Sequence, residues 1–311
     1  MADTEAPVES RDYVGPADLR AMQALTSRCW SLDERHHVGG LAWQRFEHVG
    51  REVEWPTRLW EAGGHVVAWG WIYERDPDLL YLQVDPAHAS LTPEVLTWFE
   101  ATASADELGV EVSDRQQDLI STLEARGYAL RTLGPFGLVN IRSLTDLPVL
   151  KPAPGFIVRT MADAPDPDRR AAAHRAAWSR IAGREDDPPG RSRVTGESYR
   201  QVMAAWPYRP ELDLVLEAPD GRWVANCCAW LDEANAIGEL EPVGTDADCR
   251  RQGHGHTVCL AALHALRGAG ATSAIVGARG DDAYPVPRRL YFGLGFTTHA
   301  RDVTYERARV T

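Results

Sequence analysis

The sequence of 311 residues has little lysine and lacks any long uncharged apolar run. A membrane-spanning helix needs about 18 or more consecutive apolar residues, and no such stretch is present. The first 14 residues are acidic and do not follow the basic-then-apolar order of an export signal. These absences predict a cytoplasmic protein that has no membrane partner.

Cysteine is also scarce, with five residues and no Cys-x-x-Cys spacing. An odd number of cysteines in apolar surroundings favours reduced, buried thiols over a disulfide framework. Neighbouring His36 and His37 have no further cysteine or histidine at metal-ligand spacing. We therefore expect this pair to lie in a solvated loop, and we expect no metal.

The net charge is −12, and the two halves of the chain contribute to it unequally. Residues 1–150 carry 24 acidic and 12 basic side chains, whereas residues 151–311 carry 21 of each. A negative protein repels phosphate backbones and favours cationic small molecules. The charge predicts no nucleic-acid partner, although acidic side chains that only keep the surface soluble would give the same count.

The two halves resemble each other when they are laid end to end. A proline-rich segment, 143–156, separates two strand-like runs and predicts a boundary between residues 1–150 and 151–311. Each half has the order strand, helix, hairpin, strand, helix, strand, helix, strand. The sequence therefore predicts an α/β fold of mixed α+β type, present twice.

A glycine-containing loop distinguishes the second half. A strand is predicted over about 236–245 and a helix from near Gly255 to Gly268 or Gly270, with an apolar stripe at i, i+3, i+4 and i+7. Gly253 and Gly255 allow a ligand to approach the backbone, and the first N–H groups of the helix have no partners within it. Arg250 and Arg251 add positive charge, so the loop predicts a site for an anion such as pyrophosphate.

The loop lacks the Gly-Lys-Ser/Thr of a P-loop and the third glycine of a dinucleotide fingerprint. Nucleoside triphosphates and NAD are therefore poor candidates, and coenzyme A remains. The corresponding segment of the first half, 87–100, contains no glycine and has a proline at the start of its helix. We expect the first half to have the same fold without the loop.

Three blocks of the second half resemble the GNAT superfamily of acyl-CoA-dependent N-acetyltransferases. The loop Arg250-x-x-Gly253-x-Gly255 is similar to the family's (Gln/Arg)-x-x-Gly-x-(Gly/Ala) signature. The preceding "ELEPVGTD" strand and the "RRLYFGLGF" helix follow the family's order on either side. The resemblance covers most of residues 155–308 and implies two tandem GNAT folds, each a mixed, mostly antiparallel sheet flanked by helices, with a degenerate first copy.

The resemblance also implies how acetyl-CoA, or another acyl-CoA, is held. The strand would splay at a bulge, the Val243 N–H would meet the acetyl carbonyl, and Thr245 would bond the pantetheine amide. The implied cofactor-binding residues are Val243, Thr245, Arg250, Arg251, Gln252, Gly253, His254, Gly255 and His256.

Catalysis on an amine requires a base, because an alkyl ammonium has a pKa of about 10 and only the neutral amine attacks. Glu239 and Glu241 are the candidates, and they lie two residues apart, on one face of a regular strand. The sequence does not decide between them. Tyr291 matches the tyrosine that protonates the CoA thiolate in many members of the family.

The acceptor cleft is expected near the first helix of the second half. Trp178, Trp206 and Tyr208 supply aromatic surface there, and residues 185–187 are acidic, a combination that suits an ammonium group. We expect acetyl transfer to a primary amine of a small molecule by direct attack in a ternary complex. A non-catalytic acyl-CoA-binding or scaffold protein and an acyltransferase for longer acyl chains are the alternatives; the amine and the oligomeric state stay open.

Overall fold

The computed structural model describes residues 7–50, 55–73, 78–180 and 192–309, which form two compact units. The first unit contains Met1–His36, Gly50–Phe136 and Ala300–Thr311, and the second contains His37–Val49 and Gly137–His299. Neither unit is a contiguous half of the chain. The predicted halves 1–150 and 151–311 describe a repeat in the sequence and stay a prediction.

The first unit is a mixed sheet with helices. Its sheet has the order β1-β2-β3-β4-β5-β13, with β6 also paired to β13, and only β4 and β5 run parallel among the recorded pairs. Its elements are β1 (Glu9–Asp12), α1 (Pro16–Arg28), β2 (Thr57–Ala62), β3 (His65–Tyr73), β4 (Asp78–Val84), the 3-10 helix η2 (Pro86–Leu91), α3 (Thr92–Thr102), β5 (Glu107–Ser113), α4 (Gln117–Ala125), β6 (Ala129–Leu130) and the greater part of β13 (Thr297–Ala308).

The second unit repeats this plan. Its sheet has the order β7-β12-β11-β10-β9-β8, in which β11 and β12 run parallel and the other recorded pairs are antiparallel. Its elements are α2 (Val38–Phe46), β7 (Gly137–Ser143), β8 (Ile157–Thr160), α5 (Pro167–Trp178), α6 (Gly196–Ala204), the 3-10 helices η3 (Pro210–Leu212) and η4 (Ala247–Cys249), β9 (Asp213–Glu217), β10 (Trp223–Asp232), β11 (Ile237–Thr245), α7 (His254–Gly268), β12 (Ser273–Arg279) and α8 (Val286–Gly293).

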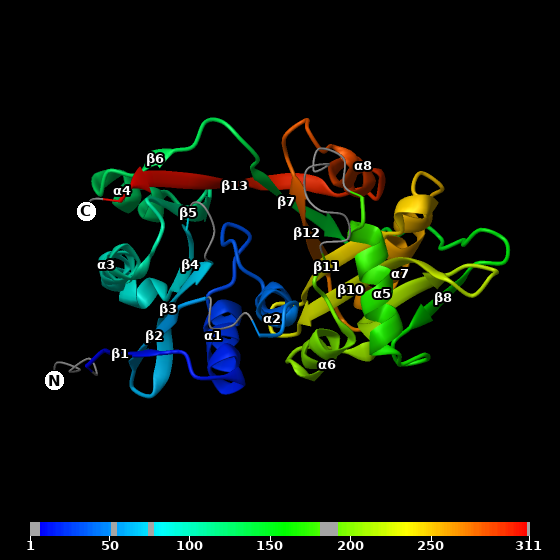
Figure 1. Cartoon of the computed structure of the whole chain (residues 1–311), viewed down its shortest axis with the longest axis horizontal. Coiled ribbons are helices and arrows are strands. Elements are labelled where there is room, and N and C mark those ends of the chain that lie inside the picture. Colours follow the sequence, from blue (N-terminus) through cyan, green and yellow to red (C-terminus); the bar gives the residue numbers. More distant parts are fainter. Residues whose placement is uncertain (1–6, 51–54, 74–77, 181–191, 310–311) are drawn as a thin grey trace. The chain divides into compact units, whose positions relative to one another are not determined.

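Helices cover both faces of this second sheet, because all of β10 is buried and successive side chains point to opposite faces. Cys227 and Leu231 on one face belong to the core cluster that contains the apolar stripe of α7. Trp230 on the other face lies against α2, and α5 also packs on β10 and β11 (Figure 1). The second sheet therefore lies between α7 on one side and α2 with α5 on the other.

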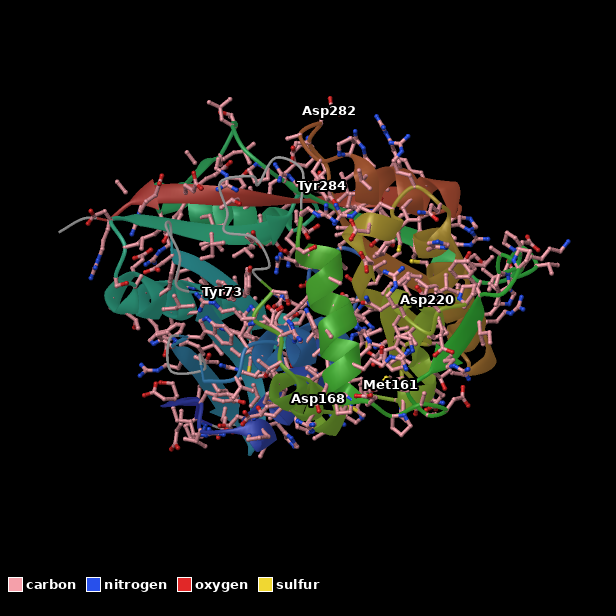
Figure 2. All side chains as sticks on the ribbon, turned by 45° about the vertical axis from the view of Figure 1, so that its right-hand side comes forward. Tyr73, Met161, Asp168, Asp220, Asp282 and Tyr284 are labelled. Atoms are coloured by element: carbon pink, nitrogen blue, oxygen red, sulfur yellow. The ribbon has the colours of Figure 1, made fainter. Side chains whose placement is uncertain are left out.

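Helices α5 and α6 form a closely packed pair. Asp168, labelled in Figure 2, lies in the first turn of α5 and forms an ion pair with Arg200 of α6. A methyl group at Gly196 would lie 1.7 Å from the Asp168 carboxylate, so only glycine permits this approach. Thr195 and Ser198 form a capping box at the start of α6, which fixes where the helix begins.

Most of the predicted elements are confirmed. The structure places β11 over Ile237–Thr245 and α7 over His254–Gly268, and the stripe of Cys259, Ala262, Leu263 and Leu266 is fully buried. The predicted element order is present in both copies, but each copy has a second helix after its first, α2 and α6, which the sequence analysis did not predict. The five cysteines are free thiols, and Cys29 alone among them is partly exposed.

Candidate active site

A bulge in β11 organises the candidate site. Cys227 pairs with Val243 and Ala229 pairs with Leu240, so β11 has one more residue than β10 between these two pairs. The extra residue lies at Glu241 or Pro242. The bulge that the resemblance implied is therefore confirmed.

The bulge changes the face to which β11 directs its side chains, since directly paired residues share a face of a sheet. Glu239 pairs with Trp230, which is on the side of α2 and α5. Beyond the bulge, Val243 and Thr245 pair with Cys227 and Ala225, which are on the side of α7. One strand thus presents Glu239 to one face of the sheet and its last residues to the other.

β11 also separates from β12 at this point. Their recorded parallel pairs end at Glu239 with Ile275, although β12 remains paired with β7 as far as Arg279. Residues 240–245 of β11 therefore have an edge that faces a widening space between the two strands. An extended ligand can pair with such an edge as an additional strand would.

The glycine loop brings the start of α7 close to the end of β11. Gly253 has a φ of 84°, which favours glycine, and caps the helix without a side-chain hydrogen bond. A methyl group at Gly255 would lie 2.9 Å from Thr245 Oγ1, so glycine permits the helix to approach the strand. The first N–H groups of α7 have no side-chain cap, and the anion site expected there stays a prediction.

The positive charge of the loop is arranged differently from the expectation. Arg250 donates to the carbonyl oxygens of Ala177, at 2.6 Å, and of Arg180, where α5 ends. This guanidinium therefore anchors the loop to α5 instead of pointing freely at a ligand. Arg251, with a φ of 63°, and Gln252 are exposed.

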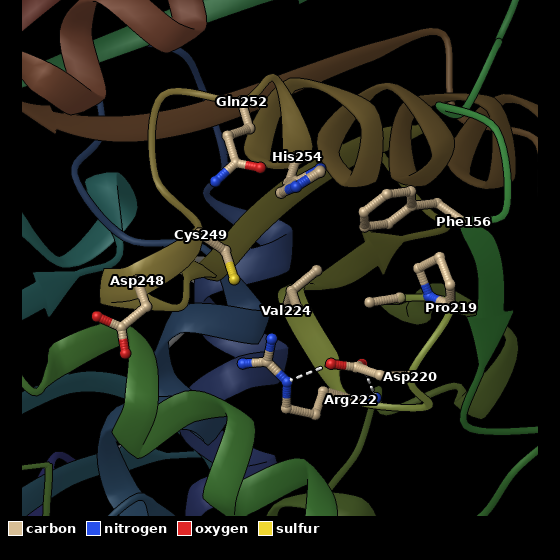
Figure 3. Close-up of a pocket in the computed structure, with 10 residues that line it drawn as sticks. Phe156, Pro219, Asp220, Arg222, Val224, Asp248, Cys249, Gln252 and His254 are labelled. Atoms are coloured by element: carbon tan, nitrogen blue, oxygen red, sulfur yellow. Dashed lines mark hydrogen bonds and ion pairs between the residues drawn. The ribbon is translucent and has the colours of Figure 1, made fainter.

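The two loop histidines also differ from each other. His254 is only 5% exposed and packs on Phe156 with ring centroids 4.5 Å apart, and burial lowers its pKa. It faces a groove of about 360 Å³ between the β9–β10 hairpin and the loop, lined also by Pro219 and Val224 (Figure 3). His256 is partly exposed. The geometry gives His254 a packing role and leaves the phosphate contact of His256 a prediction.

The carboxyl of Glu241 is the most strongly perturbed acid of the site. Burial, followed by the negative charges of Glu239 and Glu47, raises its pKa to about 8. Its backbone carbonyl accepts a hydrogen bond of 2.5 Å from the Trp230 indole. A carboxyl with a pKa near 8 can exchange a proton close to neutral pH.

Glu239 is held by a segment from the first half of the sequence. Its Oε2 lies 3.0 Å from His37 Nδ1, and a methyl group at Gly40 would lie 3.2 Å from the same oxygen. A methyl group at Gly39 would lie 2.1 Å from the Trp230 ring, so both glycines permit α2 to pack against β10 and β11. The start of α2 is therefore part of the site.

The sequence analysis missed this contribution and placed His36 and His37 in a solvated loop, which is wrong. His37 is buried at the start of α2, and His36, in the first unit, packs against the rings of Trp69 and Tyr81. The signal was the Gly39-Gly40 pair that follows the histidines, because two small residues at a helix start indicate close packing.

Tyr291 completes the group of predicted catalytic residues. It lies on α8, 6% exposed, and burial, followed by Cys259 and Glu241, raises the pKa of its phenol well above 10. The hydroxyl therefore stays protonated and can donate a proton. Tyr284, labelled in Figure 2, lies in the turn before α8. It also contributes to raising the pKa of the Tyr291 phenol.

The three aromatic residues predicted for the acceptor cleft do not form one cluster. Trp178 stacks on His174 with ring centroids 4.3 Å apart, and Trp206 is 38% exposed. Tyr208 donates to Asp213 at 3.1 Å. Tyr208 therefore belongs to a buried network, whereas Trp178 and Trp206 keep exposed surface. The acidic residues 185–187 lie outside the described part of the chain.

Two features are absent from the described residues. None of their helices is long and apolar enough to span a bilayer. Within the same residues, no group of three or more histidine, cysteine, aspartate and glutamate side chains is arranged to bind a metal ion.

Comparison with known proteins supports the resemblance. No family model matches the chain. A mycothiol acetyltransferase from Kineococcus radiotolerans is 32% identical over 162 residues, which are 52% of this chain and 49% of that protein. The chain thus matches about half the length of this curated relative.

Solved structures share the whole architecture. A GCN5-related N-acetyltransferase from Sphaerobacter thermophilus is 20% identical and superposes with a TM-score of 0.58, covering 98% of this chain and 96% of the other. A tandem GNAT protein from the clavulanic acid biosynthesis pathway is 13% identical with a TM-score of 0.61, covering 98% and 99%. The predicted mixed, mostly antiparallel sheets flanked by helices are confirmed, and the chain shares the fold of these GNAT-type acetyltransferase structures.

Proposed function

We propose that the protein is an acetyl-CoA-dependent N-acetyltransferase that acts on a primary amine of a small molecule. The observation that carries the proposal is the bulge in β11, which separates Glu239, on the face of α2, from Val243 and Thr245, on the face of α7, and has Glu241 at or beside it. A base and an anion-binding helix start are thereby brought to opposite sides of one strand. Direct transfer within a ternary complex uses both sides at once.

The residues around the glycine loop fit coenzyme A. The uncapped start of α7 offers N–H groups and the positive end of the helix dipole to the pyrophosphate. Gly253 and Gly255 keep side chains out of the way, and Thr245 lies directly beside Gly255. When bound, acetyl-CoA supplies a thioester whose carbonyl carbon is the electrophile.

The carboxylates prepare the amine. Glu239 and Glu241 attract the ammonium form, and Glu241 takes one of its protons, because a base whose pKa lies near 8 is better matched to an amine than an ordinary carboxylate. The bound cation in turn favours the charged form of Glu241 before the transfer. Glu239 orients the amine.

The transfer is balanced by two protons. The amine nitrogen forms a bond to the carbonyl carbon, the carbon–sulfur bond breaks, and the second proton that the nitrogen loses passes through solvent to restore the phenol of Tyr291. The Val243 N–H stabilises the negative charge that develops on the carbonyl oxygen. Tyr291 donates its phenolic proton to the departing sulfur, and its raised pKa ensures that the proton is present.

A binding and turnover experiment tests the proposal. The melting temperature is measured with acetyl-CoA, propionyl-CoA and free CoA, and release of thiol is followed over a panel of primary amines. Because the curated relative is named for mycothiol, the panel includes an unacetylated precursor of mycothiol. We expect the melting temperature to rise with acetyl-CoA, since a ligand that binds only the folded state stabilises it.

Glu241→Gln and Tyr291→Phe should each lower kcat by roughly 10²–10⁴-fold without weakening acetyl-CoA binding. The exposed Glu233→Gln is the matched control. If acetyl-CoA binds but no amine is turned over above background, the protein is an acyl-CoA-binding protein instead. A larger stabilisation by propionyl-CoA would identify a longer acyl donor.

A further inference from the structure

We infer that His37 is a positioning residue that holds Glu239 through a proton on Nδ1. This inference rests on the proposed function. It assigns a role in the site to the segment His37–Val49, which comes from the first half of the sequence but belongs to the second unit.

The geometry around His37 Nδ1 contains a conflict. This nitrogen lies 3.1 Å from the Gly39 N–H, as the N-cap of α2, and 3.0 Å from Glu239 Oε2. A nitrogen with a lone pair can accept from Gly39 but would face a carboxylate oxygen without a proton between them. A nitrogen that carries a proton can donate to Glu239 but cannot cap Gly39. One atom cannot serve both partners in one state.

Burial selects between these states. The His37 side chain is fully buried, and in the described part of the chain its Nε2 has no hydrogen-bond partner. A protonated ring would bury an unpaired N–H at that position, which costs about 1–3 kcal/mol. A proton on Nδ1 alone avoids this cost and can donate to the Glu239 carboxylate, and such a hydrogen bond to a charged group is stronger than the neutral bond from Gly39 that it replaces.

The surroundings make the position of Glu239 important. Glu239 and Glu47 both raise the pKa of Glu241, so movement of the Glu239 carboxylate changes the basicity of its neighbour. Titratable groups from the other elements packed around this part of the second unit are Cys228 on β10, His174 on α5, Tyr199 on α6 and Tyr291 on α8. None of these is the partner of Glu239 Oε2 recorded in the described residues.

A pair of substitutions separates positioning from capping, because aspartate and asparagine are equally good N-caps. His37→Asn can accept from Gly39 with its oxygen and donate to Glu239 with its nitrogen. His37→Asp caps equally well but places a second carboxylate beside Glu239. Positioning predicts that His37→Asn keeps kcat within about threefold of the wild type, whereas His37→Asp loses at least about tenfold, at an unchanged KM for acetyl-CoA.

The pH profile gives a second readout. The added carboxylate in His37→Asp should move the acidic limb of kcat/KM, which Glu241 sets, to higher pH, and His37→Asn should leave the limb in place. Equal rates and equal limbs in the two variants would show that His37 only caps α2 and would overturn the inference.

A spectroscopic measurement decides the matter without activity. The ¹⁵N shifts of the His37 ring in the full-length protein report which nitrogen is protonated, and we expect Nδ1–H. Glu239→Gln should change the His37 shifts, while Glu233→Gln should not. A ring that carries its proton on Nε2 overturns the inference, even if the proposed acetyl transfer is correct. If the proton is on Nδ1 but the protein acetylates no amine, the contact between His37 and Glu239 stands and the proposed function is rejected.

Discussion

The two units contain the same pair of diverging strands but use the space between them differently. The recorded parallel pairs end at Leu80 with Val110 in the first unit and at Glu239 with Ile275 in the second. In the first unit, β3 and β4 stay in unbroken register, whereas β11 of the second unit has the bulge. The backbone plan is thus shared, and the bulge of the second unit is a local addition to it.

Side chains of the first unit bridge its own diverging strands. Glu34 accepts hydrogen bonds from Gln83 on β4, at 3.0 Å, and from Gln116, just beyond β5, at 2.8 Å. Arg35 stacks on Tyr81 of β4 and forms an ion pair with Glu111 of β5. The same region of the second unit carries the proposed catalytic residues. The first unit therefore satisfies these polar groups with partners of its own.

The largest effect is expected from the packing that distinguishes the second unit. Gly39→Ala would place a methyl group 2.1 Å from the Trp230 ring and should cost about 3 kcal/mol of unfolding free energy, with loss of turnover. Chemical denaturation measures this cost. Gly40→Ala is the matched control for stability, because the atoms nearest to its methyl group, at 3.2 Å or more, belong to the end of the Glu239 side chain and not to a packed ring. Equal stabilities of the two variants would contradict the close packing of α2.

A pH-dependent stability difference should follow from Glu241. Its pKa is higher in the folded state, about 8, than the ordinary value of 4.5, so the folded state binds the proton more tightly. The protonated Glu241 carboxyl therefore favours the folded state, and this contribution to stability is fully present below pH 4.5 and is lost as the pH rises through 8. Glu241→Gln should remove the loss and be more stable than the wild type at pH 9 by on the order of 2 kcal/mol. Parallel melting curves from pH 5 to 9 would contradict the burial of this carboxyl.

Affinity for acetyl-CoA should depend on the loop of the second unit alone. Gly255→Val would force the start of α7 away from Thr245 and should raise the Kd at least about tenfold, or about 1.4 kcal/mol. The matched change in the first unit is Ala89→Val in the exposed η2, which should leave the Kd unchanged. Isothermal titration calorimetry should give one acetyl-CoA per chain. A stoichiometry of two would show that the first unit also binds.

The smallest effect is expected within the first unit. Glu34 accepts hydrogen bonds from the side-chain amides of Gln83 and Gln116. Glu34→Gln can place an N–H2 group against one of these donors, which should lower the free energy of unfolding by about 1 kcal/mol. Turnover should stay unchanged, because Glu34 lies in the unit that lacks the glycine loop. Denaturant unfolding and the thiol assay check both statements, and a loss of turnover at full stability would assign the first unit a part in catalysis.

Local patterns in the sequence were sufficient for the helix α7, the glycine loop and the repeat. The apolar stripe of Cys259, Ala262, Leu263 and Leu266 determines which face of α7 is buried. The resemblance supplied the bulge, which no periodicity reveals, since Glu239 and Glu241 alternate in exposure as they would in a regular strand.

The partners of these residues could not be predicted, because they are distant in the sequence. Arg250 binds carbonyl oxygens at the end of α5, and Glu239 meets a histidine about 200 residues earlier. The local sequence of the loop or of the strand contains no pattern that indicates either contact. The assignment of His37–Val49 to the second unit likewise depends on tertiary packing, of which only the glycine pair gives a hint.

The interleaved composition of the units has a consequence for how such a protein can be shortened or recombined. A chain that began at residue 151 would lack α2, which covers Trp230, and β7, which pairs with all seven residues of β12. The unpaired edge of β12 and the indole of Trp230 would then be exposed to solvent. The second unit thus depends on elements from both halves of the sequence, so a cut at residue 151 removes parts that its sheet requires.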